Sequence, residues 1–403
     1  MNILIAQFRY YPSITQLLSD LNKSRVKTRK KYYIDEIENL LFIYMQKISL
    51  PLWTIAAPIL AWIAYFGLSL NFGDYYKFIL GAGLIGSVLA AVHHAETVAH
   101  RVGEPFGTLI LALAITIIEV ALIVSIMLSG GPETAVLARD TVFAAVMIIL
   151  TGITGICLFV GGIKFREQTF RLKGVSAALI TLTAILILTL VLPNYTTSEA
   201  GPSYSNVQLG FVAVISLVLY GTFVLVQTFR HRDYFLPKET DGNEEVHANP
   251  PSKQTAIVSM VILLLCLAIV VILAKSLAED IEIAVLNAGA PESLVGVIIA
   301  AVVLLPEGMA AYRAARKNRL QTSLNLALGS ALASIGLTIP AVAAVSMITG
   351  LTITLGIDTK STVLLLLSLF TVTLSLANGK TNILQGIVLL VIFAVYLFTI
   401  IAP

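Results

Sequence analysis

The chain has 403 residues, of which 57% are hydrophobic and only 12% charged, and its mean hydropathy is +0.90. Soluble domains carry about 25% charged residues, so this composition excludes a soluble globular protein and indicates an integral membrane protein. The net charge of +3 is ordinary for a membrane protein with basic loops. Cys157 and Cys266 lie in apolar runs and match no disulfide or zinc spacing. We therefore expect no nucleic-acid partner, no resident metal and no cofactor.

The N-terminal stretch, residues 1–47, is polar and contains the basic cluster Lys23–Lys31. We interpret it as a solvated tail that anionic membrane lipids would attract. Residues 45–53 would themselves make a good start for a membrane protein. For that reason residues 1–44 are set apart, and no function is assigned to them.

Eleven apolar segments follow the tail, and each is long enough to cross a bilayer as a helix. They span residues 49–70, 76–95, 106–128, 141–162, 174–192, 207–229, 255–274, 292–312, 323–349, 361–377 and 383–402. The sequence therefore predicts an all-α membrane protein with about eleven transmembrane helices.

The segments divide around a polar, acidic linker at residues 230–254. Residues 48–75 form a leading helix, and residues 76–229 and 255–403 hold five segments each. Because five is an odd number, the second group enters the membrane from the opposite side. Inverted repeats of this kind place the substrate site near the midplane, between the two halves.

Lysine and arginine residues in the loops predict the topology. With the N-terminus in the cytoplasm, fourteen of them lie in inside loops and four in outside loops. The inside residues are Arg101, Lys164, Arg166, Arg171, Lys173, Arg230, Arg232, Lys238, Lys253, Arg313, Arg316, Lys317, Arg319 and Lys380, and the outside residues are Lys77, Arg139, Lys275 and Lys360. The bias predicts a multi-pass protein of the plasma membrane with a cytoplasmic N-terminus and linker and an external C-terminus.

One glutamate stands well inside an apolar membrane segment in each half of the chain. Glu119 lies in Phe106–Leu128, and Glu307 lies in Glu292–Tyr312. A carboxylate at mid-depth costs about 2.5–3.5 kcal/mol on insertion scales, so such residues usually face a cavity and mark an ion or proton path. Two of them in matched positions predict a cation transporter.

Two neighbours of the glutamates add to the predicted site. Thr116 precedes Glu119 by three residues and so shares its helical face, where its hydroxyl could contact the carboxylate or the ion. Pro306 stands immediately before Glu307, so it disturbs the helix and can free a backbone carbonyl near that carboxylate.

The helix after Glu307 carries further oxygen atoms. Asn325, Ser330 and Ser334 could complete a cation shell, and we predict that all three contribute to the cation and proton site. Small residues also form a stripe on this helix, and we interpret the glycines of the stripe mainly as a close-packing surface.

Asp140 begins the helix that follows the first glutamate helix. It stands fifteen residues before Gly155, just as Gln321 stands fifteen residues before Gly336, and this shared spacing supports the repeat. Because Asp140 lies at the outer end of its helix, we expect a gate or mouth role for it rather than a central ligand role.

His93, Glu96 and His100 share one helical face at the cytoplasmic end of a segment. Their spacing could hold a transition metal, but it lacks the His-Glu-x-x-His pattern of metalloproteases. We favour an interfacial, pH-sensing role and keep a metal-dependent intramembrane hydrolase as the rival hypothesis.

From Met45 onward the chain resembles the calcium/cation antiporter superfamily (CaCA), and within it the ChaA-type cation/proton antiporters. The resemblance rests on HAETVAHRVGEPFGTLILALAITIIEV, ARDTVFAAVMII, LLPEGMAAYRAARKNRLQTSLNLALGSALASIGLTIP and NGKTNILQGIVLLVIFAVYLFTI. It implies that Glu119 and Glu307 are the paired glutamates that exchange cation for proton. Thr116 and Leu304 stand where calcium/proton exchangers carry an amide, so sodium or potassium is favoured over calcium as sole substrate.

The mechanism that follows is exchange by competition for one site. Two buried carboxylates cannot both stay ionised and empty, so they hold either protons or a cation (Ca²⁺, Na⁺ or K⁺). Rocking of one repeat against the other would expose the site to each side in turn. A cation channel is the second rival, because repeat symmetry does not exclude it.

Overall fold

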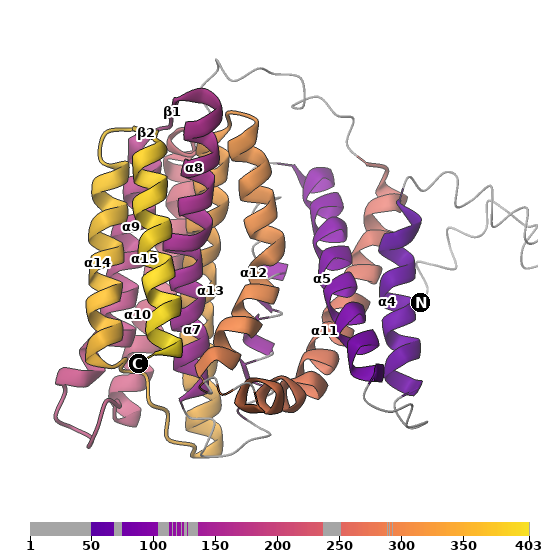
Figure 1. Ribbon diagram of the computed structural model, residues 1–403, viewed down its shortest axis with the longest axis horizontal. Coiled ribbons are helices and arrows are strands. Elements are labelled where there is room, and N and C mark those ends of the chain that lie inside the picture. The colour runs from indigo at the N-terminus through magenta and orange to yellow at the C-terminus, as the bar shows by residue number, and fades with distance from the viewer. Residues whose placement is uncertain are drawn as a thin grey trace, which may run out of the picture.

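The computed structural model describes residues 50–67, 75–103, 136–236, 251–287 and 293–402, together with residues 113, 114, 116, 117, 119–121, 123, 124, 127, 289 and 291. The described chain is almost entirely helical (Figure 1). Its main helices are α4 (Leu52–Gly67), α5 (Tyr75–Val102), α7 (Leu137–Met147), α8 (Thr154–Phe165), α9 (Leu172–Leu186), α10 (Asn206–Leu225), α11 (Lys253–Asn287), α12 (Ser293–Arg316), α13 (Leu320–Thr349), α14 (Thr359–Leu376) and α15 (Ile383–Ile401).

Short irregular turns lengthen or interrupt several of these helices. A π-helical turn, η3 (Ile148–Ile153), joins α7 to α8, and further π turns, η4 (Ile187–Val191) and η6 (Val226–Arg230), extend α9 and α10. Short 3₁₀ turns, η5 (Leu192–Tyr195) and η7 (Arg232–Tyr234), follow η4 and η6. π turns inside membrane helices often mark functional positions.

The described helices agree with a multi-span membrane protein. Within the described ranges, eight helices are long and apolar enough to cross a membrane, and the bent α12 would make a ninth. The leading helix α4 is apolar but shorter, at 16 residues. Most of the predicted segment 106–128 lies outside the described residues, so the count of eleven and the repeat arrangement stay predictions.

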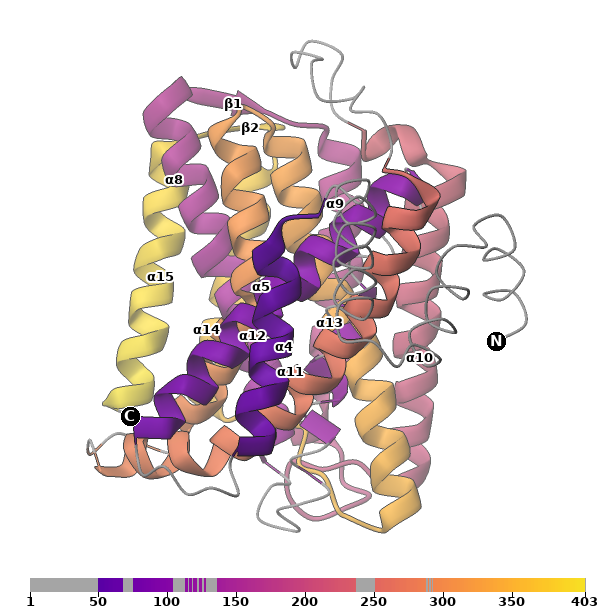
Figure 2. The same ribbon diagram turned by 90° about the vertical axis from the view of Figure 1, so that its right-hand side faces the viewer.

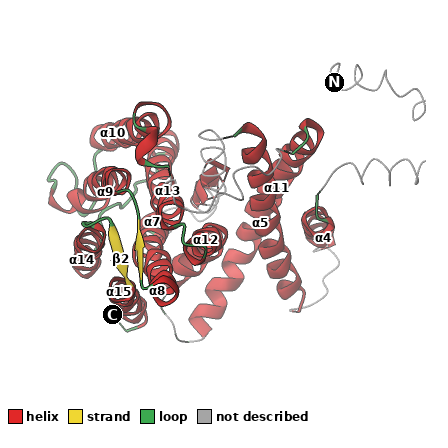
Figure 3. Cartoon of the chain, turned by 90° about the horizontal axis from the view of Figure 1, so that it is seen from above, coloured by secondary structure: helices red, strands yellow, loops and turns green. Residues whose placement is uncertain are grey.

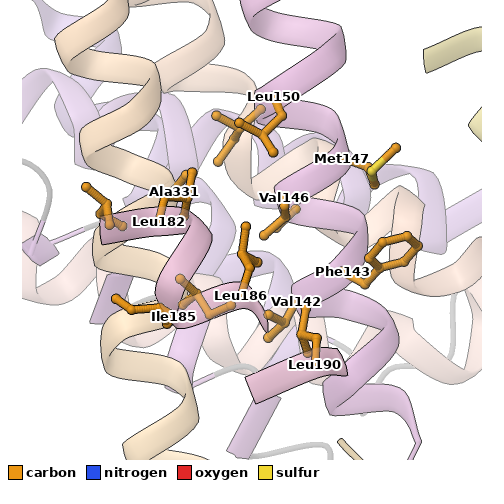
Figure 4. Close-up of a cluster of buried hydrophobic side chains, with 14 of the residues drawn as sticks. Val142, Phe143, Val146, Met147, Leu150, Leu182, Ile185, Leu186, Leu190 and Ala331 are labelled. Atoms are coloured by element: carbon orange, nitrogen blue, oxygen red, sulfur yellow. The ribbon is translucent and has the colours of Figure 1, made fainter. Parts of the chain in front are cut away.

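The helices pack around two separate hydrophobic cores. One core joins α4, α5 and α11, which stand together at the right of Figure 1 and lie in front of the other helices in Figure 2. The larger core joins α7, η3, α9, α10, α13, α14 and α15. Figure 4 shows part of it, with Val142 and Leu150 from one span, Leu182 and Leu186 from another, and Ala331 from α13.

Helix α12 lies between the two groups of helices, as the view from above shows (Figure 3). Its residues contribute to both sides: Val297 and Leu304 belong to the larger core, and Val295 and Ile299 form a small cluster that Val92 of α5 contacts. The described part of 106–128 is divided in the same way, with Ala114 in the smaller core and Ile123 in the larger one.

Equivalent glycines support a repeat at the level of packing. An added Cβ at Gly155 in α8 would lie 3.1 Å from Leu390 of α15, and one at Gly336 in α13 would lie 2.8 Å from Tyr220 of α10. Each glycine, fifteen residues into its span, therefore admits close approach of the last helix of one predicted repeat. We had interpreted the glycines of the α13 stripe as packing residues; the contact at Gly336 agrees, whereas an added Cβ at Gly329 would meet no described atom within 4 Å.

Loops predicted to share one side of the membrane meet at one end of the bundle. Strand β1 (Glu167–Thr169) pairs antiparallel with β2 (Lys380–Asn382), and Lys164 donates to the carbonyl of Arg316. At the opposite end Ser203 forms an isolated β-bridge with Thr354. The hydrophobic pattern had not predicted either pairing, because three-residue strands carry no periodic signal.

Candidate functional site

Both predicted membrane glutamates are buried and contact one helix. The Ser330 hydroxyl donates to Oε1 of Glu307 over 2.7 Å, and the Ser334 hydroxyl donates to Oε1 of Glu119 over 2.6 Å. Glu119 is 4% exposed and Glu307 7% exposed. The structure therefore brings together four of the residues that the sequence predicted for one site.

The local sequence explains how one helix serves two carboxylates. Ser330 and Ser334 are four residues apart, so their hydroxyls project from the same face of α13, about 6 Å apart along its axis. Glu307 comes from α12, which packs directly on α13, and Glu119 comes from the segment that lies between the two cores. The two halves of the chain thus meet at α13.

Helix α12 bends by 54° between its parts Leu294–Leu305 and Glu307–Arg316. The bend lies at Pro306, where the missing backbone N–H removes one helical hydrogen bond, as the sequence predicted. Immediately after it, an added Cβ on Gly308 would lie 3.2 Å from Ile153 of η3, so the bent helix packs closely on the π turn. The bend sets the position from which Glu307 enters the site.

One carboxylate oxygen of Glu307 has no hydrogen-bond partner within the part of the chain that the structure describes. That oxygen, Oε2, is buried. A buried oxygen of this kind is costly unless it holds a proton or contacts a cation. Among the described residues, the Glu307 carboxylate thus has one oxygen held by Ser330 and one without a hydrogen bond.

Thr116 lies on the same buried side of its helix as Glu119, at 4% exposed, in agreement with the predicted shared face. Thr151 and Thr154, on the span related to α13, are fully buried, but their hydroxyls donate to Met147 and Ile149 carbonyls in their own span. Those two threonines therefore do not reach the carboxylates in this state.

Asn325 is not brought to the glutamates, which corrects its predicted place in the cation shell. Its Nδ2 donates to the carbonyl of Phe235 over 2.6 Å, and its Oδ1 accepts from Gln321 over 2.9 Å. The reason is helical rotation: Asn325 is turned by about 140° from Ser330 and about 180° from Ser334 at 100° per residue. The small-residue stripe that suggested Asn325 is a different face from the one that holds the serines.

Asp140 lines a cavity of about 180 Å³ at the end of the bundle opposite β1 and β2. Its Oδ1 accepts from Nε of Arg139 over 2.8 Å, and the same guanidinium donates to the Gly356 carbonyl. The gate or mouth role expected for Asp140 stays a prediction, and its place in the cavity wall is the observation behind it. Arg139 was not singled out beforehand, although an opposite charge beside Asp140 was a usable signal.

The second half of the chain supplies the other wall of this cavity. Asp358 caps α14, where it accepts from the backbone N–H of Ser361 over 2.6 Å, and Lys360 donates to the Thr399 carbonyl. Burial raises the pKa of Asp358, but the hydrogen bonds from Ser361 and the charges of Lys360 and Arg139 outweigh it and hold the pKa below its usual value. Asp358 is therefore ionised at neutral pH.

His93, Glu96 and His100 lie along α5 at the linker end of the smaller core. No group of three metal-ligating side chains comes together within the parts of the chain that the structure describes. The buried histidine is instead His94, which is 0% exposed and places Nε2 3.2 Å from the Thr54 carbonyl of α4. Its spacing from Ala91 and Val98 on the buried face could have identified it.

Comparison with known proteins places the chain in a class of ion exchangers. The family described as sodium/calcium exchanger protein matches residues 76–229 and 258–402. The chain therefore belongs to the sodium/calcium exchanger family, and it is an antiporter rather than an enzyme.

Two individual proteins are similar to this chain over most of its length. The sodium-potassium/proton antiporter ChaA of Escherichia coli K12 is 35% identical over 322 residues, which cover 79% of this chain and 87% of the relative. A protein of Sinorhizobium fredii named as an ionic transporter, y4hA, is 48% identical over 320 residues, with the same two coverages.

Solved structures share the fold. YfkE, a Ca²⁺/H⁺ antiporter, superposes with a TM-score of 0.66 at 19% identity, over 87% of this chain and 100% of its own. The H⁺/Ca²⁺ exchanger CAX superposes with a TM-score of 0.65 at 17% identity, over 86% of this chain and 87% of its own. These likenesses establish the fold of a cation antiporter.

Proposed function

We propose that this protein is a secondary antiporter that exchanges protons for cytoplasmic cations at a site formed by Glu119 and Glu307. The observation that carries the proposal is the pair of buried carboxylates held by Ser330 and Ser334 on one helix, with Oε2 of Glu307 left unpartnered among the described residues. An empty, doubly ionised site is costly at this depth, so the carboxylates exchange protons for a cation instead of staying vacant.

Sodium and potassium are the cations we propose first. The relative with 35% identity is named a sodium-potassium/proton antiporter. Leu304 is a buried apolar residue one turn before Glu307, and Asn325 is engaged elsewhere, so no amide oxygen from these positions joins the carboxylates. Ca²⁺ prefers six to eight oxygen ligands, which makes it the secondary candidate.

We propose alternating access by movement between the two cores rather than between the two predicted repeats, because each core contains helices of both repeats. The smaller core of α4, α5 and α11 and the larger core are joined by the parts of the chain that carry the carboxylates. Movement of one core against the other would open the site to each side in turn while the serines keep hold of the glutamates.

The loop charges support the orientation. The basic loops around β1 and β2 would face the cytoplasm, and the Asp140 cavity would face outward, in the plasma membrane. With an inward proton gradient the protein would then extrude cations from the cell.

The test is cation-driven proton movement in inverted membrane vesicles, measured with a pH-sensitive dye while sodium, potassium and calcium are added in turn. Glu119→Gln and Glu307→Gln should each abolish exchange, because the amide mimics the protonated state but cannot release a proton. Glu167→Gln, the same change at an exposed carboxylate of β1, is the matched control and should exchange normally. Wild-type exchange by either membrane variant would refute the proposed site.

The same assay separates the rivals. A channel would pass cations down their gradient without counter-movement of protons. A metal-dependent hydrolase would need His93 and His100, whereas the antiporter should keep exchanging when both are replaced by glutamine.

A further inference from the structure

A closed ring of hydrogen bonds lies at the linker end of α13, away from the carboxylates. The backbone N–H of Arg171 donates to Oε1 of Gln321 over 2.6 Å, and Nε2 of Gln321 donates to Oδ1 of Asn325 over 2.9 Å. Nδ2 of Asn325 donates to the Phe235 carbonyl over 2.6 Å. The Arg171 guanidinium donates to the Asp233 carbonyl over 2.9 Å, and the backbone from Asp233 to Phe235 closes the ring.

The two amides are suited to this ring by their chemistry. The ring begins at a backbone donor and ends at a backbone acceptor, so each intervening side chain must accept at one end and donate at the other. Among uncharged side chains of this length, an amide does so with separate atoms, and the ends of the ring fix which atom of Gln321 and Asn325 is oxygen. An apolar side chain of similar size, leucine at position 325 or methionine at position 321, would lose the hydrogen bonds without adding a charge.

The ring ties three parts of the chain to one another. Arg171 leads from β1 into α9, Gln321 and Asn325 belong to α13, and Phe235 ends the turn that opens the linker. Gln321 is 2% exposed. The aromatic side chain of Phe235 packs edge-on against Phe223 of α10, with 5.7 Å between the centroids of the two side chains. The N-terminal end of α13 is therefore held by Arg171 of the first predicted repeat and by Phe235 at the start of the linker.

The fixed end lies close to the site along the same helix. Ser330 is five residues beyond Asn325, about 7.5 Å along the axis, and Ser334 is about 13.5 Å beyond it. A helix without a break over this distance transmits a rotation or a shift of its end to both hydroxyls. In α13 the only proline within the described helix, Pro340, comes after both serines.

We propose that Gln321 and Asn325 are positioning residues, which set the rotation and depth of α13 and so hold the Ser330 and Ser334 hydroxyls at the two carboxylates. This role rests on the proposed exchange site, but it assigns these amides neither cation nor proton contact. Loss of one ring bond turns or shifts α13, and the serines then hold the carboxylates less well.

The test is a double-mutant cycle on the cation concentration for half-maximal exchange. Asn325→Leu and Gln321→Met each remove the amide, keep the approximate size of the side chain and add no charge. Each should raise that concentration at least about 2-fold, because at least one neutral hydrogen bond is lost, with little change in the maximal rate. Thr322→Ala, on the same helix outside the ring, should change it less than 2-fold.

The decisive arm repeats Asn325→Leu in a protein that also carries Ser330→Ala and Ser334→Ala. Since the ring acts through those hydroxyls, the substitution should then have almost no effect. If the double-serine protein exchanges too slowly, Ser330→Ala alone replaces it, and the effect should shrink at least by half on a logarithmic scale.

Equal fold-changes in both backgrounds would overturn the positioning role, as would lower thermal stability with an unchanged half-maximal concentration. The exchange function itself is judged separately, by the wild-type protein and the glutamate variants, so the two failures are distinguishable.

Discussion

Replacement of Ser334 by alanine tests how the site holds its first carboxylate. The hydroxyl donates to Glu119 over 2.6 Å, and both residues are buried, at 2% and 4% exposed. A hydrogen bond to a charged group contributes about 1.5–3 kcal/mol, and a water entering in place of the hydroxyl would recover part of it. At about 1.4 kcal/mol per tenfold change, the ceiling on the loss of cation affinity is roughly 10- to 150-fold.

The assay is proton movement in inverted vesicles as a function of sodium or potassium concentration. Ser334→Ala should raise the half-maximal cation concentration by up to roughly 10- to 150-fold. Ser330→Ala should have an effect of the same size, because the Ser330 hydroxyl donates to Glu307. Ser346→Ala is the control, because its buried hydroxyl donates to the Leu351 carbonyl at the far end of the same helix. A Ser334→Ala protein that matches this control within 2-fold would refute the role of the hydroxyl.

Two further predictions concern packing and topology. Gly336→Ala should destabilise the protein by about 1–3 kcal/mol through overpacking, because the new Cβ would lie 2.8 Å from Cβ of Tyr220. Gly329→Ala is the control and should not destabilise it, because its new Cβ would meet no atom within 4 Å among the described residues. Thermal unfolding in detergent measures the stability of both variants. A cysteine placed in the linker should resist a membrane-impermeant thiol reagent in intact cells, whereas one placed after Pro403 should react. The two native cysteines should not react with the reagent, because both are 0% exposed. The reverse labelling pattern would contradict the proposed orientation.

The carboxylates were predictable because a membrane segment tolerates few ionisable groups. Glu119 and Glu307 stand out against their apolar surroundings, and insertion cost alone makes them functional candidates. Ser330 and Ser334 were predictable for a weaker reason, since a hydroxyl on a neighbouring helix is only one of many polar groups. Their spacing of four residues was the useful signal, because it places both on one face.

Asn325 shows where the sequence argument was wrong. Its amide was predicted to be a cation ligand because Asn325 lies in the stripe of small residues. Such a stripe shows which face of a helix packs closely, but it does not show which part of the chain packs there. Rotation by about 140° from Ser330 was calculable from the sequence and would have excluded a shared site. Its true partner, the Phe235 carbonyl, was beyond prediction because the backbone of a turn carries no side-chain signal.

A hydroxyl suits an exchange site because one atom serves both of its states. When the carboxylate is ionised the serine donates to it, as Ser330 and Ser334 do here. When the carboxyl is protonated, the same oxygen can accept from it after a rotation of the O–H bond. The side chain therefore need not leave its place as proton replaces cation. Because both serines belong to one helix, the carboxylates of the two halves stay hydrogen-bonded to the same helix through the cycle. A shift of α13 therefore moves both hydroxyls at once.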